Sequence, residues 1–302
     1  MKRLSGTFFY GLVFVFSFLF FVYLSFPYAI LKEALVSQIS TVSGYDIKVA
    51  KLGPKLPLGF ELEGVQVAME NASQGIDLKS LEASVSLLSL MIGRVSGTVE
   101  LVSQNDGYME VDVGFSLLDL ITQTFIPRDI ELQADGFAIG HISKLGFAVV
   151  DQKFPGFGFV TELKGNLHGN IVMELDPENL SQSPGSMNIQ LKKSRLALDP
   201  GLNLGAQNFE KALIKAKVRS GVVKFDKKSG FHSQLLKIDL GGEIKLKKKI
   251  QQSTLSIQVA IQLLKELKDQ IGPLLSSVTG SSSGKIQVDI KGILANPKVR
   301  TK

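Results

Sequence analysis

The chain has 302 residues, of which 44% are hydrophobic and 21% are charged, and it contains no cysteine, no tryptophan and only three histidines. A chain of this length and composition can bury a sizeable core, which excludes a disordered protein and a disulfide-stabilised mini-protein. The lack of cysteine excludes thiol nucleophiles, zinc–thiolate sites, iron–sulfur clusters and lipid attachment through an N-terminal cysteine. With so little histidine as well, the composition argues against an enzyme and against a multi-histidine metal centre.

The first element in chain order is an apolar segment near the N-terminus. Residues 8–26 contain no acidic or basic side chain over nineteen positions, enough at 1.5 Å per residue to cross about 30 Å of hydrocarbon. We expect an uncleaved anchor rather than a signal peptide, because the segment exceeds the usual apolar length and no small-x-small cleavage motif follows it. The residues assigned to this membrane anchor are Phe8, Phe14, Phe18, Phe21 and Phe26.

The residues around this segment predict its orientation. Lys2 and Arg3 precede it, and a short positive N-terminus stays in the cytoplasm. No later stretch reaches the same length without charge, which predicts a single-pass protein of the inner membrane. We therefore expect residues 1–27 to form a cytoplasmic stub and transmembrane anchor, and residues 28–302 to form one β-rich domain in the bacterial periplasm.

Several segments after the anchor have the composition or spacing of short helices. Residues 29–42 place apolar side chains near helical intervals, which predicts an amphipathic helix that continues from the membrane. Residues 264–275 show similar spacing. A further short helix is expected around residues 116–125, with a strand as the alternative for an apolar run of this length. The apolar run at residues 84–93 is too short to span a membrane and predicts a buried strand or a short helix.

Alternation of apolar and polar side chains dominates the rest of the sequence and is typical of half-buried strands. It is clearest at residues 109–115, 236–246, 255–261 and 286–290, and Asn105-Asp106-Gly107 predicts a hairpin turn. We expect a mainly β fold, with an elongated, curled antiparallel sheet and a few short amphipathic helices after the transmembrane helix. The sequence leaves open whether the sheet forms an open groove or a closed sandwich.

One face of each expected strand is apolar, and in an open sheet these faces would line a common groove. The side chains expected to line it are Val111, Val113, Leu236, Ile238, Ile257, Val259, Ile286 and Val288. Such a groove would accept the acyl chains of phospholipid or lipopolysaccharide. In a sandwich, the same side chains would form an ordinary core.

The net charge of +6 hides an uneven distribution. Residues 1–190 carry 12 basic and 20 acidic side chains, whereas residues 191–250 carry 15 basic and 5 acidic ones. Such a dipolar body would orient against an anionic bilayer or an acidic partner. We interpret lysines such as Lys245 and Lys247 more simply, as the solvated faces and guarded edges of strands. Nucleic acid is not an expected partner, because no aromatic platform is interleaved with the basic residues.

The motifs that look catalytic lack the context that catalysis requires. Residues 280–284 satisfy G-x-S-x-G, but a nucleophile elbow follows a strand and opens a helix, and here the expected order is reversed. His168 has no second ligand at metal-binding spacing, and Gly156-Phe157-Gly158 lacks the third glycine of a dinucleotide fingerprint. We therefore expect no catalytic residue, no cofactor and no metal site.

Taken in chain order, the turn and strand motifs resemble those of a known family. They are Phe26-Pro27-Tyr28, residues 44–47, 52–54, 58–65 and 78–81, the strand around Gly97, and residues 290–298. This full-length pattern resembles the type II secretion system protein N family, in the form carried by delta-proteobacteria and spirochaetes. It resembles the AsmA-like envelope proteins more remotely. The motifs are structural, so the resemblance transfers no catalytic residue.

The two resemblances imply different functions. The secretion family implies a non-enzymatic, inner-membrane-anchored component that works with other type II secretion subunits in the export of folded proteins. The AsmA-like proteins imply a β-groove whose apolar lining carries lipid acyl chains between membranes. We expect the secretion function and keep lipid binding or lipid transfer as the alternative.

Overall fold

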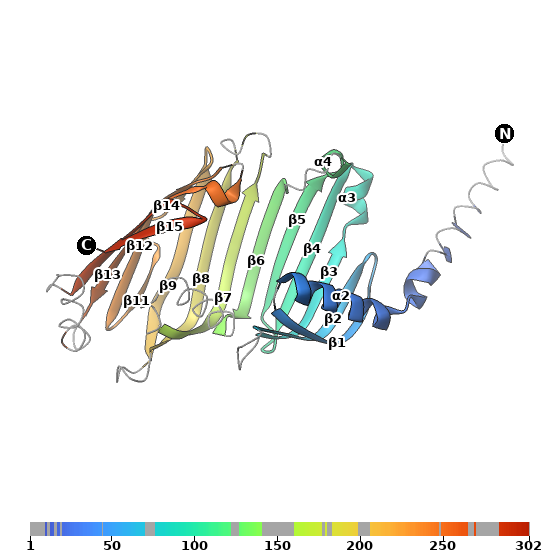
Figure 1. Cartoon of the computed structure of the whole chain (residues 1–302), viewed down its shortest axis with the longest axis horizontal. Helices are drawn as coiled ribbons and strands as arrows, with labels where there is room; N and C mark the ends of the chain where they lie inside the picture. Colours follow the sequence, from blue (N-terminus) through green and yellow to red (C-terminus); the bar gives the residue numbers. More distant parts are fainter. Residues whose placement is uncertain are drawn as a thin grey trace.

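The computed structural model shows a mainly β protein built on one antiparallel sheet of fifteen strands, with few helices (Figure 1). The residues it describes are 10, 13–14, 17–18, 20–43, 45–69, 76–121, 127–140, 160–176, 179, 183–198, 206–247, 249–264, 269 and 284–301. The prediction of a mainly β fold with an antiparallel sheet and few helices is confirmed.

The strands follow one another through the sheet in nearly the order of the sequence. Hydrogen-bonded neighbours run from β1 to β10 and on through β12 to β15, while β11 pairs with both β9 and β12. The strands are β1 (Tyr45–Lys55), β2 (Gly59–Met69), β3 (Ile76–Val85), β4 (Arg94–Ser103), β5 (Tyr108–Ser116), β6 (Asp129–Ala138), β7 (Val160–Glu174), β8 (Gly185–Leu198), β9 (Gln207–Arg219), β10 (Val222–Phe225), β11 (Gly230–Ser233), β12 (Leu236–Lys245), β13 (Thr254–Leu263), β14 (Lys285–Ile293) and β15 (Asn296–Thr301). The sheet is therefore a long meander with β1 and β15 at its two edges.

The helices lie beside the first strand or at strand ends. Those with defined bounds are α2 (Tyr28–Ser43), α3 (Leu87–Met91), α4 (Leu117–Ile121) and the 3₁₀ turn η3 (Ile250–Gln252). α2 contacts β1, and α3 and α4 contact the strands β4 and β5 beside them. α2 confirms the helix expected at residues 29–42, and α4 confirms the helix expected around residues 116–125 over Leu117–Ile121, while residues 122–125 lie outside the described residues. The helix expected at residues 264–275 lies almost entirely outside the described residues.

The expected anchor overlaps the described residues only in part. Phe8 lies outside them, whereas Phe14, Phe18, Phe21 and Phe26 are described, with exposed fractions between 46% and 71%. Across the described ranges, no helix combines the length and the apolar character needed to cross a bilayer.

The apolar run at residues 84–93 forms one of the two structures expected of it. It ends β3 and forms α3, so the short helix is confirmed. The helix leaves apolar side chains uncovered, since Leu88 is 77% exposed and Ile92 is 73% exposed. The run lies at the ends of the strands, beyond the sheet face that shields apolar residues elsewhere.

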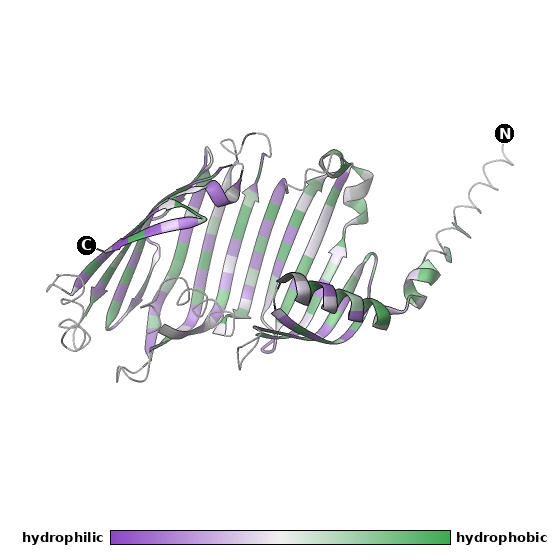
Figure 2. Cartoon of the chain, viewed as in Figure 1, coloured by the Kyte–Doolittle hydropathy of each residue, from purple (hydrophilic) through white to green (hydrophobic). Residues whose placement is uncertain are grey.

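The two faces of the sheet differ in polarity. Figure 2 shows hydrophilic and hydrophobic residues alternating along the strands, as the sequence pattern predicts. Residues that pair directly across an antiparallel ladder share a face, so the pairing register identifies the members of each face. In β6 an extra residue interrupts the alternation near Gly136, whose φ of 72° suits glycine at a bulge.

Candidate functional site

A series of apolar residues pairs directly across the strands of the sheet. This central apolar row comprises Phe60, Ala83, Val99, Val111, Leu132, Ile171, Met187, Ala216 and Phe225. It crosses nine strands, β2 to β10, and with neighbours about 4.8 Å apart it spans roughly 38 Å. An apolar track therefore runs perpendicular to the strands, along the long axis of the molecule (Figure 1).

The side chains of this row are mostly half-buried. Ala216 is buried and Phe60 is exposed, while the members between them, such as Val111 and Ile171, are intermediate. Within the described parts of the chain, substantial contacts join neighbours in the sheet or a helix and its adjacent strand, and all strands belong to one sheet. The described strands therefore do not form the two packed sheets of a sandwich.

All eight residues expected to line a groove lie on the face that carries the row. A series of directly paired residues connects Val113 through β6–β10 to Ile244 of β12. Val113 and Ile244 therefore lie on the same face of the sheet. The first group is Val111 and Val113 in β5. The second group, in β12–β14, is Leu236, Ile238, Ile257, Val259, Ile286 and Val288. The structure thus brings the expected residues together on one face, but as two separate groups.

The members of the central apolar row that lie between these two groups were missed by the sequence analysis. They are Leu132, Ile171, Met187 and Ala216, in β6–β9. Two short alternating stretches carry a usable signal, since residues 130–134 read Ile-Glu-Leu-Gln-Ala and residues 187–191 read Met-Asn-Ile-Gln-Leu.

An apolar pocket of about 620 Å³ lies at the N-terminal end of the row. Phe60, Ala83 and Val99, the first three members of the row, line one side of it. Phe26 and Leu31 line it from the N-terminal segment and α2. The pocket therefore joins the apolar face of the sheet to the end of the expected anchor.

Tyr23 fixes the N-terminal helical segment to this pocket. Its hydroxyl donates a hydrogen bond to the Lys55 carbonyl oxygen at 2.7 Å and accepts one from the Gly59 N–H at 3.2 Å. The Tyr28 hydroxyl donates to the Tyr23 carbonyl oxygen at 2.7 Å, and the two rings meet edge to face with centroids 6.2 Å apart. These contacts tie the chain just before Phe26 to the turn between β1 and β2.

The opposite face carries a row of carboxylates in the N-terminal part of the sheet. Its members, Glu61, Glu82, Glu100 and Glu110, pair directly across β2–β5. Lys55 forms an ion pair with Glu82. Burial raises the pKa of Glu110, and the negative charge of Asp112 raises it further. Like charges directly opposite one another destabilise a sheet, so this row costs stability at neutral pH.

Glu110→Gln should raise the thermal midpoint of unfolding at pH 7. A carboxyl group with a raised pKa binds its proton more tightly in the folded state, so its favourable contribution is complete below the unfolded pKa and is lost as the pH rises through the folded pKa. Neutralising Glu110 should therefore add about 0.5–1 kcal/mol at pH 7 and nothing near pH 4. Glu82→Gln is the matched control in thermal melts at both pH values, because it loses the ion pair with Lys55. An equal gain from Glu82→Gln would contradict this account.

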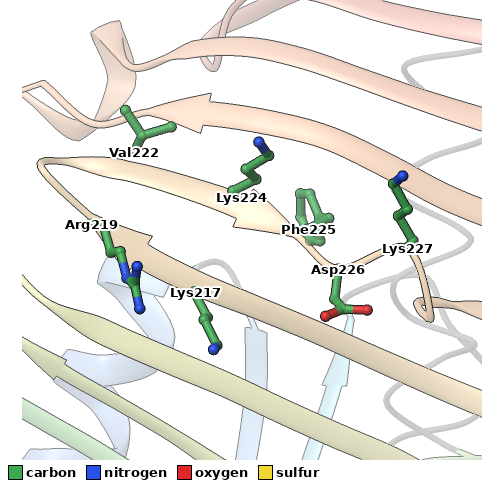
Figure 3. Close-up of a pocket in the computed structure, with 7 residues that line it drawn as sticks. All are labelled: Lys217, Arg219, Val222, Lys224, Phe225, Asp226 and Lys227. Atoms are coloured by element: carbon green, nitrogen blue, oxygen red, sulfur yellow. The ribbon is translucent and has the colours of Figure 1, made fainter.

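Towards β9 and β10 the same face becomes basic. A hollow of about 400 Å³ lies there, and Figure 3 labels the residues that line it: Lys217, Arg219, Val222, Lys224, Asp226 and Lys227, together with Phe225 from the last position of the central apolar row. Lys217 and Lys224 pair directly across the two strands. The acidic and basic parts of the sequence thus occupy separate ends of one polar face. Lys245 and Lys247 are exposed, as their interpretation as solvated strand residues requires.

The histidines on described strands are paired with single carboxylates. His168 Nδ1 lies 2.7 Å from Asp135 Oδ1, and His232 Nε2 lies 2.7 Å from Asp239 Oδ1. Burial raises the pKa of Asp239, but hydrogen bonds from His232 and Lys237 outweigh it and hold the pKa below its usual value. The described ranges contain no group of three or more His, Asp or Glu side chains able to hold a metal. Ser282 and the 156–158 glycine motif lie outside those ranges.

Comparisons with known proteins do not identify a relative of the chain. No protein family, no curated protein and no solved structure matches it. The function is therefore argued from the geometry of the sheet and from the sequence motifs.

Proposed function

We propose that the protein is a membrane-anchored lipid-binding protein of the cell envelope, whose apolar sheet face holds acyl chains. The observation that carries this proposal is the central apolar row, which crosses nine strands and whose side chains are mostly only partly buried. Moving each CH₂ group of an acyl chain out of water is favourable by about 0.8 kcal/mol of free energy. The row supplies an apolar surface on which these groups can be buried. An acyl chain lying along the row would remove its own apolar surface and that of the row from water.

The direction of the row favours a role in lipid transfer. The row starts at the pocket beside Tyr23 and Phe26 and runs away from the N-terminal end of the molecule (Figure 1). In this proposal residues 8–26 anchor the protein in the inner membrane, and residues 28–302 extend into the periplasm as an open, curled groove. The pocket, which falls in the 300–1,000 Å³ range of small-molecule sites, is the entry for an acyl chain from the bilayer.

Photo-crosslinking of the full-length protein in nanodiscs tests this function. The probe is a phosphatidylethanolamine with a diazirine at the end of one acyl chain, and the adducts are mapped by peptide mass spectrometry. We expect adducts at Leu132, Ile171 and Met187, which are far along the row from the anchor. Adducts confined to residues 8–26 would contradict lipid binding by the sheet.

Gly97→Phe should block the entry to the row without unfolding the protein. Gly97 lines the pocket, and the nearest atom to a Cβ built there is the Ser84 carbonyl oxygen at 3.7 Å. A side chain in place of a strand glycine also removes a conformational cost of about 0.5–1 kcal/mol. We expect an unchanged or raised thermal midpoint and a loss of most crosslinking at Ile171.

Gly241→Phe is the matched control for this substitution. Like Gly97, Gly241 lies inside a strand, and no atom lies within 4 Å of a Cβ built on Gly241, but it pairs with Gln258 on the polar face. This variant should crosslink lipid as the parent protein does. Normal labelling of folded Gly97→Phe would show that lipid does not enter through the pocket.

A role in type II secretion is a second proposal, and the full-length motif resemblance is the observation that favours it. The motif at residues 290–298 spans the β14–β15 hairpin, so it is a turn-and-strand motif without a chemical site. Deleting the gene and measuring export of the pathway's exoproteins tests this role. Undiminished export through an intact pathway would remove it, whereas lost export with normal lipid crosslinking would support both roles.

A further inference from the structure

Exposed apolar side chains gather at one end of the first five strands. This apolar rim consists of Leu56, Leu58, Leu87, Leu88, Ile92, Leu117, Leu118 and Ile121. Leu118 and Ile121 on α4 are 72% and 70% exposed, similar to Leu88 and Ile92 beside α3. Single exposed apolar residues are ordinary on a protein surface, but a contiguous group marks an interaction site.

Backbone hydrogen bonds show that the rim is contiguous. The Val85 N–H, just before α3, donates to the Leu58 carbonyl oxygen at 2.8 Å. The Leu117 N–H, at the start of α4, donates to the Gly93 carbonyl oxygen at 3.0 Å. The β1–β2 turn, α3 and α4 therefore follow one another along one edge, and α3 and α4 lie side by side at the top of the sheet (Figure 1).

The rim begins where the expected anchor ends. Tyr23 lies near the end of that segment, and its hydroxyl donates a hydrogen bond to the carbonyl oxygen of Lys55, the residue before Leu56. Leu58 belongs to the rim and also lines the apolar pocket, together with Phe26. An apolar surface thus continues from the anchor through the pocket to α3 and α4.

We propose that the apolar rim inserts into the leaflet of the inner membrane that faces the periplasm. Apolar faces of this kind settle about 5–10 Å into the boundary between headgroups and acyl chains. Arg94 starts β4 directly after the rim, and its side chain is 66% exposed although its Nη1 lies 4.0 Å from Asp129 Oδ2. This exposed guanidinium is suited to bind lipid phosphate. The insertion would place the pocket in contact with acyl chains. This inference rests on the anchor assigned in the proposed function.

Depth-dependent fluorescence quenching of the full chain tests the inference. The sequence has no cysteine, so one substituted cysteine carries one fluorophore. Leu88→Cys and Leu118→Cys, labelled with an environment-sensitive dye, are reconstituted in phosphatidylethanolamine–phosphatidylglycerol nanodiscs that contain doxyl-labelled lipid. Both positions are exposed, so the substitutions leave the fold intact. We expect a blue-shifted emission and quenching by roughly twofold or more, as for a dye within the acyl boundary.

Two further positions serve as controls. Phe14→Cys reports the anchor and should be quenched, whereas Gln104→Cys lies in the exposed turn at the other end of β4 and should not be. Quenching at position 14 without quenching at positions 88 and 118 would contradict insertion of the rim into the membrane and would still support the anchor. Equal quenching at 88, 118 and 104 overturns a specific insertion. Quenched rim positions without lipid adducts at Ile171 support the rim and contradict lipid binding by the sheet.

Discussion

Ile171→Asp should abolish lipid crosslinking along the central apolar row, whereas Asn170→Asp should leave it unchanged. The two residues are neighbours in β7 and are both half-buried, but they lie on opposite faces. Ile171 pairs with Leu132 and Met187 in the row, whereas Asn170 pairs with Gln133 and Asn188 on the polar face. An acyl chain that covered a carboxylate would strip it of water at a cost of several kcal/mol, so the chain should be excluded.

The stability of Ile171→Asp separates an open face from a covered one. On an open face the new carboxylate stays hydrated, and the loss is about 1–2 kcal/mol, as expected for a half-buried apolar side chain. In a covered core the same change would add the cost of burying a charge, and the protein would lose its fold. Thermal unfolding should therefore be measured beside crosslinking. A folded variant that still crosslinks lipid at Met187 would contradict the proposed groove.

The parts of the fold with uninterrupted alternation could be predicted from the sequence. Residues 109–115 and 255–261 alternate strictly, because each pleat turns successive side chains to opposite faces. β7 and β8 could not be predicted in the same way. Their register shifts between Lys164 and Asn166, and Lys193 has a φ of 50°. Each such irregularity shifts the phase of the alternation by one residue, so only short stretches such as residues 187–191 alternate and the full length of the strand cannot be recognised.

The candidate site could be predicted as a set of faces but not as a continuous track. Val111 and Ile257 were assigned to an apolar face from their own strands, and the structure puts both on the same side of the sheet. That Val111 pairs with Leu132 depends on long-range register, which local composition does not encode. The exposure of Leu88 could not be predicted for a related reason, since only the fold places the apolar run at residues 84–93 beyond the end of the sheet.

Gly169→Ala should cause a large loss of stability, although the substitution adds only one methyl group beside the central apolar row. Gly169 lies in β7, two residues before Ile171, and its φ of 130° is in a region that side chains rarely adopt. A Cβ built there would lie 1.9 Å from the carbonyl oxygen of Asn188, on the neighbouring strand. Strain and overpacking together should lower the free energy of unfolding by about 3 kcal/mol or more, measured by denaturant unfolding. Gly97→Ala, whose built Cβ meets nothing closer than 3.7 Å, should cost nothing.

The position of Gly169 links this loss to function. It pairs with Ala134 and Ile189, so it holds β7 in register between β6 and β8 at the middle of the central apolar row. A shift of β8 by one residue would move Met187 to the polar face and divide the row in two. Any folded fraction of Gly169→Ala should therefore crosslink lipid at Val99 but not at Met187. Crosslinking at both positions, or unchanged stability, would show that the apolar track does not depend on this close approach of the two strands.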